Sequence, residues 1–165
     1  MADQVKQHLD GAMRMFRVAE VQCDELNERT VQLKAPPAAL RDLDVVWEKY
    51  MLWLVCVRQV AVSVGNAGTA AGSPTHFQHW WDGLQHDPTH AFFRQERNDV
   101  LKAVAETIEI CKTTDGLGTS LAYWVFRRGP REGRPLVPVC QQYDEWLYHS
   151  LWAQACQLLH PAPVA

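Results

Sequence analysis

Three basic side chains and an asparagine follow a pair of phenylalanines in residues 90–102, which read HAFFRQERNDVLK. On a helix, Arg94, Asn98 and Lys102 lie four residues apart and share one strip, and Arg97 flanks that strip. The strip borders the positions that face the core, so it would lie where two helices meet. Guanidinium groups bind phosphate and carboxylate oxygens through paired hydrogen bonds. The spacing therefore predicts a cationic cleft that contacts RNA, a nucleotide or another anion.

A second basic group lies in residues 127–134, RRGPREGR, where one glutamate offsets four arginines. These arginines are further candidates for anion or RNA binding: Arg127, Arg128, Arg131 and Arg134. Each group also has a simpler interpretation. The turn would be a hairpin tip that uses charge to stay soluble, and residues 90–102 would be a solvated helix face in which Glu96 or Asp99 pairs with a neighbour.

Four histidines fall within fifteen residues: His76, His79, His86 and His90. Imidazoles are common ligands of zinc, so these residues are candidates for a metal site. No HExxH or ExxH motif is present, and the Asp87-Pro88 pair predicts a helix start between the first two histidines and the last. The sequence therefore favours histidines at the surface or between helices, and no metal or other cofactor.

The totals fit one domain that spans residues 1–165 and carries a net charge of −3. Such a charge excludes a global basic field, so any contact with nucleic acid would need a local patch. The five cysteines are odd in number and widely spaced, which favours reduced thiols in a cytoplasmic protein. The most apolar run, residues 50–64, is shorter than the roughly 20 residues of a membrane span and is interrupted by Arg58 and Gln59. We expect a buried helix there, and no membrane contact.

Apolar residues at steps of three and four predict four long helices, over residues 3–34, 38–64, 88–112 and 138–160. A short helix should begin after Ser73-Pro74 and run to about Leu84. Residues 65–72, GNAGTAAG, have the composition of a flexible loop.

The aromatic and β-branched run at residues 119–126 predicts a strand, with residues 135–139 as its partner across the arginine turn. The expected fold class is therefore mainly α. We expect an up-and-down four-helix bundle with a short extra helix and a β-hairpin before the last helix.

Phe92-Phe93-Arg94, followed by Arg97-Asn98, together with this order of helices, resembles the HEPN-like superfamily of four-helix bundles. That superfamily includes prokaryotic toxin and defence ribonucleases. The resemblance covers most of the chain in helix order and implies a homodimer, because the arginine motif of the family usually lies at a dimer interface. Active members carry a histidine a few residues after the arginine, and here Lys102 stands about where it would be expected.

That departure bears on catalysis, because cleavage through a 2′-hydroxyl needs a proton acceptor near neutral pH and an unperturbed lysine stays protonated. We therefore expect a non-catalytic HEPN-like binding or interaction protein whose partner is RNA or another protein. The alternative is a metal-independent endoribonuclease of toxin or defence type, using the four residues of the strip, with a histidine such as His90 in the missing role. A metal-binding bundle built on the histidines is the third hypothesis.

Overall fold

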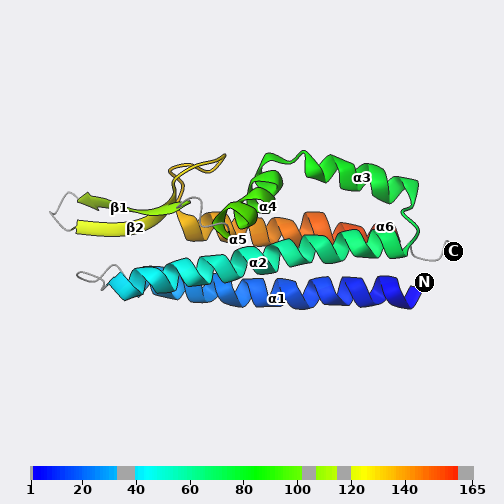
Figure 1. Ribbon diagram of the computed structural model, residues 1–165, viewed down its shortest axis with the longest axis horizontal. Coiled ribbons are helices and arrows are strands. Elements are labelled where there is room, and N and C mark those ends of the chain that lie inside the picture. The colour runs from blue at the N-terminus through cyan, green and yellow to red at the C-terminus, as the bar shows by residue number, and fades with distance from the viewer. Residues whose placement is uncertain (1, 33–39, 102–106, 115–119, 160–165) are drawn as a thin grey trace.

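The structure, a computed structural model, describes residues 2–32, 40–101, 107–114 and 120–159. It is mainly helical, with one small antiparallel sheet of two strands, as the sequence predicts. Three rods lie side by side along the long axis of the molecule (Figure 1). They are α1 (Ala2–Gln32), α2 (Leu40–Ala70) and the continuous run of α5 (Leu136–Trp146), η1 (Leu147–Ala153) and α6 (Gln154–Leu159).

The long first helix agrees with its prediction, because its apolar residues recur every three or four positions and are buried as one stripe. Ala12 and Ala19 are fully buried in that stripe. Small side chains let two helix backbones approach closely, and α1 makes its most extensive contacts with α2. Residues 33–39, where Pro36 and Pro37 were expected to end the first helix, lie outside the described part of the chain.

The second helix runs through Ala70, so the expectation of a flexible loop over residues 65–72 is wrong for most of that segment. Its glycines make room for aromatic rings of α3 (Thr75–Gln85). A Cβ built on Gly68 would lie 2.0 Å from Cε1 of Phe77, and one built on Gly65 would lie 3.1 Å from Cζ2 of Trp81. The chain then turns at Gly72 and Ser73, which both adopt positive φ.

One helix among the described residues, Asp44–Ala70, is long and apolar enough to span a membrane by length and composition. Half of its apolar window is buried inside the protein. Its inward side carries large fully buried residues such as Tyr50 and Trp53, which form part of the core.

The predicted helix over residues 88–112 is wrong in its second half. Helix α4 covers Pro88–Leu101, whereas Ile108–Thr114 forms strand β1. This strand pairs antiparallel with β2 (Ser120–Phe126), and Ile108 lies opposite Phe126. Isoleucine and threonine favour a pleated strand, and pairing along seven residues outweighs the helical spacing of the apolar positions.

The predicted strand over residues 119–126 is confirmed by β2, but its predicted partner is wrong. Of residues 135–139, only Pro135 pairs with β2, through an isolated β-bridge to Val125, and α5 begins at Leu136. The arginine turn is therefore the connection from β2 to α5 and not the tip of the hairpin. The predicted last helix is present, and seven of its residues form a π-helical stretch, η1.

An aromatic cluster fixes α4 against the rods. The ring of Phe93 lies 5.1 Å from that of Trp53 on α2, 4.5 Å from that of Tyr143 on α5 and 5.8 Å from that of Phe126 on β2. These aromatic contacts anchor α4 on three other elements, and so they set which of its side chains reach the space between α2, α3 and α5.

Candidate anion-binding site

The first turn of α4 is fixed by Asp87, as the Asp87-Pro88 signal predicts. The carboxylate of Asp87 accepts a hydrogen bond of 2.8 Å from the backbone N–H of His90. A side-chain oxygen in this position satisfies an amide that would otherwise lack a partner at the helix start. Arg94 follows His90 by four residues, so the two side chains lie on the same face of α4.

His90 is 2% exposed, and its Nδ1 lies 2.7 Å from the hydroxyl of Tyr143. Its ring centroid lies 5.2 Å from that of Trp146. Burial lowers the pKa of His90 to about 4, and the positive charge of Arg94 acts in the same direction. Burial also raises the pKa of Tyr143. Near neutral pH the pair is therefore an uncharged imidazole bonded to an uncharged phenol.

A pocket of about 280 Å³ lies beside this pair, between α2, α3, α4 and α5. Its polar lining consists of Arg58, Gln85, His90, Arg94 and Tyr143. Its apolar lining consists of Val57, Ala61, Val62, Trp81 and Phe93. No carboxylate lines it, so two guanidinium groups supply the formal charge of its described walls.

The hydrogen-bond donors of the pocket exceed its acceptors. The guanidinium of Arg94 donates to Oε1 of Gln85, and the buried Nε2 of Gln85 has no acceptor among the described residues. Within the described ranges, Arg58 is half-buried and forms neither a hydrogen bond nor an ion pair. A buried donor without an acceptor costs free energy, which an incoming acceptor would recover. The arrangement is suited to receiving an anion.

Of the predicted cationic strip, the structure places Arg94 at this interhelical pocket. Arg97 and Asn98 belong to α4, but their side chains lie outside what the structure describes, and so does Lys102. Arg58 lines the pocket but is not among the site residues predicted from the sequence. The sequence does contain a signal for Arg58, because it interrupts an otherwise apolar run of a core helix. A charged residue in such a run needs a polar partner or a solvent-filled space.

The four arginines of the turn do not join Arg94 in this pocket. Arg131 donates from Nη2 to Oγ1 of Thr89 at 3.2 Å, so it docks on the start of α4. Arg127 lies 3.9 Å from Glu109, a distance that gives a weak exposed pair. Arg134 is exposed and Arg128 is half-buried.

The backbone of this turn is also packed against α4. Gly129 has a φ of +84°, and a Cβ at this position would lie 2.3 Å from Cε2 of Phe92. The turn is thus held against α4 and is not the tip of the hairpin, although most of its residues are exposed to solvent.

The histidines lie apart. His76 is exposed and its Nε2 is 2.9 Å from the carbonyl oxygen of Leu158. His79 and His86 are exposed, whereas His90 is buried. Among the residues that the structure describes, no group of three or more histidine, cysteine or acidic side chains is arranged to hold a metal ion.

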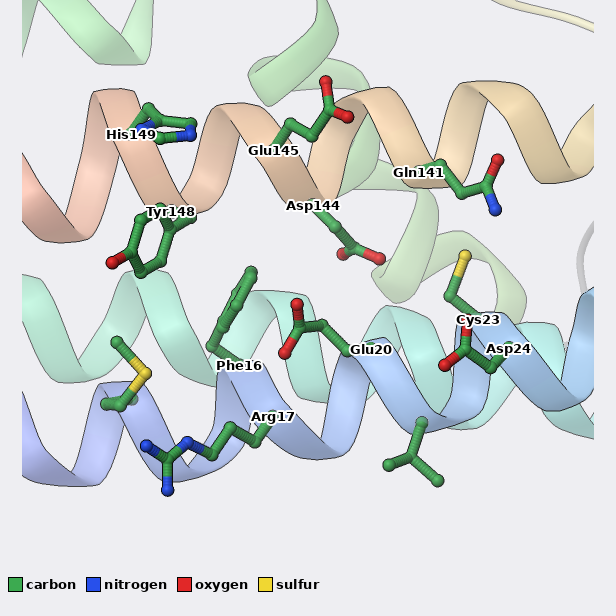
Figure 2. Close-up of a pocket in the computed structure, with 12 residues that line it drawn as sticks. Phe16, Arg17, Glu20, Cys23, Asp24, Gln141, Asp144, Glu145, Tyr148 and His149 are labelled. Carbon is green, nitrogen blue, oxygen red and sulfur yellow. The ribbon is translucent and has the colours of Figure 1, made fainter.

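A second, larger hollow of about 970 Å³ lies between α1 and the α5–η1 run (Figure 2). Four carboxylates line it: Glu20, Asp24, Asp144 and Glu145. Asp144 is 6% exposed and accepts hydrogen bonds of 3.0 and 3.1 Å from Nε1 of Trp53. Burial raises the pKa of Asp144 to about 7, and the charges of Glu20 and Asp24 add to that effect. Arg17 and His149 also line the hollow, which makes it unlike the acid-free pocket beside α4.

Comparisons of the chain with family models, with curated proteins and with solved structures give no match. The function is therefore argued from the geometry of the site.

Proposed function

We propose that this protein is a non-catalytic binding module that holds an anionic group in the pocket between α2, α3, α4 and α5. The observation that carries the proposal is the convergence of Arg58 and Arg94 on one pocket whose described walls contain no carboxylate. Two guanidinium forks from different helices are suited to the oxygens of one carboxylate or phosphate group. Gln85 adds a buried donor that has no acceptor.

The state of His90 supports binding without catalysis. A general base works best when its pKa lies near the working pH, and burial lowers the pKa of His90 to about 4. Its Nδ1 is also engaged with Tyr143. His90 is thus the histidine nearest to Arg94 on α4 but is a poor proton acceptor near pH 7.

The proposal includes the wider reading of the chain as a HEPN-like homodimer, with α1, α2, α4 and α5 as the four helices of an up-and-down bundle. It is supported by the motif around Arg94 and by the order of these helices. Light scattering over a range of concentrations tests the dimer. A constant mass of one chain would remove that part of the proposal and leave the pocket intact.

The binding function is tested by calorimetric titration of the protein with inorganic phosphate, acetate and phenylacetate. We expect saturable binding of at least one of these anions, and a loss of roughly tenfold or more in affinity on Arg58→Gln and on Arg94→Gln, because each removes a charge-assisted hydrogen bond. Arg134→Gln is the matched control, since Arg134 is exposed and does not line the pocket. Absence of binding by all three anions, or equal affinity in every variant, would contradict the proposal.

The endoribonuclease alternative has its own test, for which Arg94 beside a histidine is the motivating geometry. The protein is incubated in excess with a mixed RNA substrate and with EDTA, which removes divalent metal. We expect intact RNA. Cleavage by the wild-type chain that disappears on Arg94→Gln would replace the binding proposal by the catalytic one.

A further inference from the structure

We infer that the ligand of this pocket is a small carboxylate with an aromatic or branched apolar body; this inference rests on the proposed anion-binding function. The charge of the pocket indicates an anionic head group, whereas its volume and its apolar wall indicate the size and the apolar body of the ligand. The observations that carry the inference are the apolar half of the lining, the fixed ring of Trp81 and the volume.

The apolar residues of the pocket lie directly beside Arg58. Val57, Ala61 and Val62 occupy successive turns of α2 around Arg58. Val62 is 39% exposed, which leaves a branched apolar side chain in water when the pocket is empty. An inorganic anion would cover little of this surface. A ligand with an apolar body would remove it from water, which is favourable in proportion to the area covered.

Trp81 gives the wall a flat, rigid section. Its ring is stacked with that of Phe77 at 6.0 Å and 12°. Its edge rests over Gly65, where a Cβ would lie 3.1 Å from Cζ2. Contacts on these sides fix the orientation of the indole, so it presents a preformed surface to the pocket. Preformed aromatic surfaces bind flat apolar groups without an ordering cost.

The volume argues for a small ligand. Pockets that take drug-sized molecules measure roughly 300–1,000 Å³, and this one is about 280 Å³. A nucleotide consists of a base, a sugar and a phosphate, and together these groups are large for a pocket of this volume. The two guanidinium groups suit a carboxylate or a phosphate, so the small volume and the apolar half of the lining are what favour a carboxylate with an apolar body.

The test compares the affinities of phenylacetate, acetate, phenylacetamide, inorganic phosphate and adenosine monophosphate by calorimetric titration at pH 7. Acetate keeps the charge and lacks the body, and phenylacetamide keeps the body and lacks the charge. We expect phenylacetate to bind at least tenfold more tightly than either, because both halves of the pocket contribute. We also expect it to bind more tightly than phosphate and adenosine monophosphate.

A matched pair of variants locates the site of the apolar body. Val62→Asn places an uncharged polar amide in the pocket wall, and Val55→Asn places one on the same helix outside the pocket, where Val55 is 38% exposed. Neither amide carries a charge that would neutralise Arg58 one turn away. We expect Val62→Asn to lower the affinity for phenylacetate by tenfold or more and Val55→Asn to leave it within about twofold. Circular dichroism of both variants confirms that each is folded.

The outcomes separate this inference from the function on which it rests. Phosphate or adenosine monophosphate binding more tightly than phenylacetate, with loss on Arg94→Gln, overturns the carboxylate and keeps the anion site. Equal affinities for phenylacetate and acetate overturn the apolar body. Binding of phenylacetate that is insensitive to Val62→Asn overturns the placement. Failure of every anion to bind contradicts the proposed function itself.

Discussion

The ring of Phe77 on α3 occupies the space that a side chain at Gly68 on α2 would fill. A Cβ on Gly68 would lie 2.0, 2.5 and 2.7 Å from three carbons of that ring. This contact sets the distance at which α3 packs against α2. Because α3 carries Trp81 and Gln85, the contact also sets the position of these two side chains in the pocket that we propose binds an anion.

Gly68→Ala should therefore destabilise the protein by roughly 1–3 kcal/mol, the usual cost of forcing extra volume into a packed interior. Gly83→Ala is the matched control, because a Cβ at Gly83 meets nothing within 4 Å and alanine is the better helix former. We expect Gly83→Ala to be neutral or to stabilise by up to about 1 kcal/mol. Urea unfolding measures both, and equal stability of the two variants would contradict the described packing.

The arginine turn offers a second steric prediction. Gly129 and Gly133 both have positive φ, at +84° and +73°, but only a Cβ at Gly129 would meet another side chain, at 2.3 Å from Phe92. Each substitution by alanine should cost about 1–2 kcal/mol of backbone strain. Gly129→Ala should cost roughly 1–3 kcal/mol more. The added variant Phe92→Ala should recover part of that extra cost in a double-mutant cycle, and full additivity would show that the turn does not pack on Phe92.

The lowered pKa of His90 predicts that the folded protein loses stability on acidification. Its pKa is about 4 in the folded chain and about 6.5 when unfolded. Between these values the unfolded state binds more protons, so the free energy of unfolding falls as the pH falls from about 6.5 to 4. The full effect is a few kcal/mol, since one pKa unit corresponds to about 1.4 kcal/mol. His90→Asn removes this slope. A variant and a wild-type protein with parallel stability curves between pH 4 and 6.5 would contradict the burial of a neutral imidazole.

Asp144 predicts the opposite slope. Its pKa is raised from 3.8 to about 7 in the folded chain. The folded state then binds more protons, so stability falls as the pH rises from about 4 to 7. Asp144→Asn keeps an amide oxygen as acceptor for Nε1 of Trp53 and cannot ionise. We expect it to be more stable than the wild type at pH 8 by a few kcal/mol, and to lack the decline. Chemical denaturation at pH 5 and pH 8 checks the sign.

The two pH dependences offset one another in the wild-type chain between about pH 4 and 6.5. As the pH rises, the contribution of His90 to the free energy of unfolding increases and that of Asp144 decreases. The double variant should therefore resemble the wild type more closely in this pH window than either single variant does. This comparison separates the two residues from the remaining carboxylates, which titrate in every variant.

Local signals in the sequence account for much of the helical fold. The three-and-four spacing of residues such as Phe16 and Leu26 predicts α1, and Asp87-Pro88 predicts the start of α4. The wrong predictions of secondary structure arise where contacts between residues distant in the sequence determine the backbone conformation. Ile108 and Cys111 fit the helical spacing of the preceding residues, but pairing with β2 makes them part of a strand. Gly65 and Gly68 belong to a segment whose glycines predict a loop, but both lie within α2. There the absence of a side chain leaves room for the aromatic rings of α3.

The candidate site shows the same limit. Local periodicity predicts that Arg94 lies between helices, and Arg94 lines the pocket, whereas the rest of the predicted strip lies outside the described side chains. Arg58 and Gln85 belong to the site through the packing of α2 and α3 against α4, and their place in it depends on tertiary contacts that no local spacing encodes. The sequence marks His90 as a candidate for metal binding or catalysis, whereas only the tertiary structure shows its burial against the hydroxyl of Tyr143.

The most direct test of the anion pocket is the nuclear magnetic resonance of arginine Nε–H groups during a titration with phenylacetate. Assignments come from the Arg58→Gln, Arg94→Gln and Arg134→Gln variants. We predict that the Arg58 and Arg94 signals shift together and saturate with one dissociation constant, while the exposed Arg134 signal stays in place. Shifts of similar size at all three arginines that never saturate, or no shift at Arg58 and Arg94, would contradict an anion site between these helices.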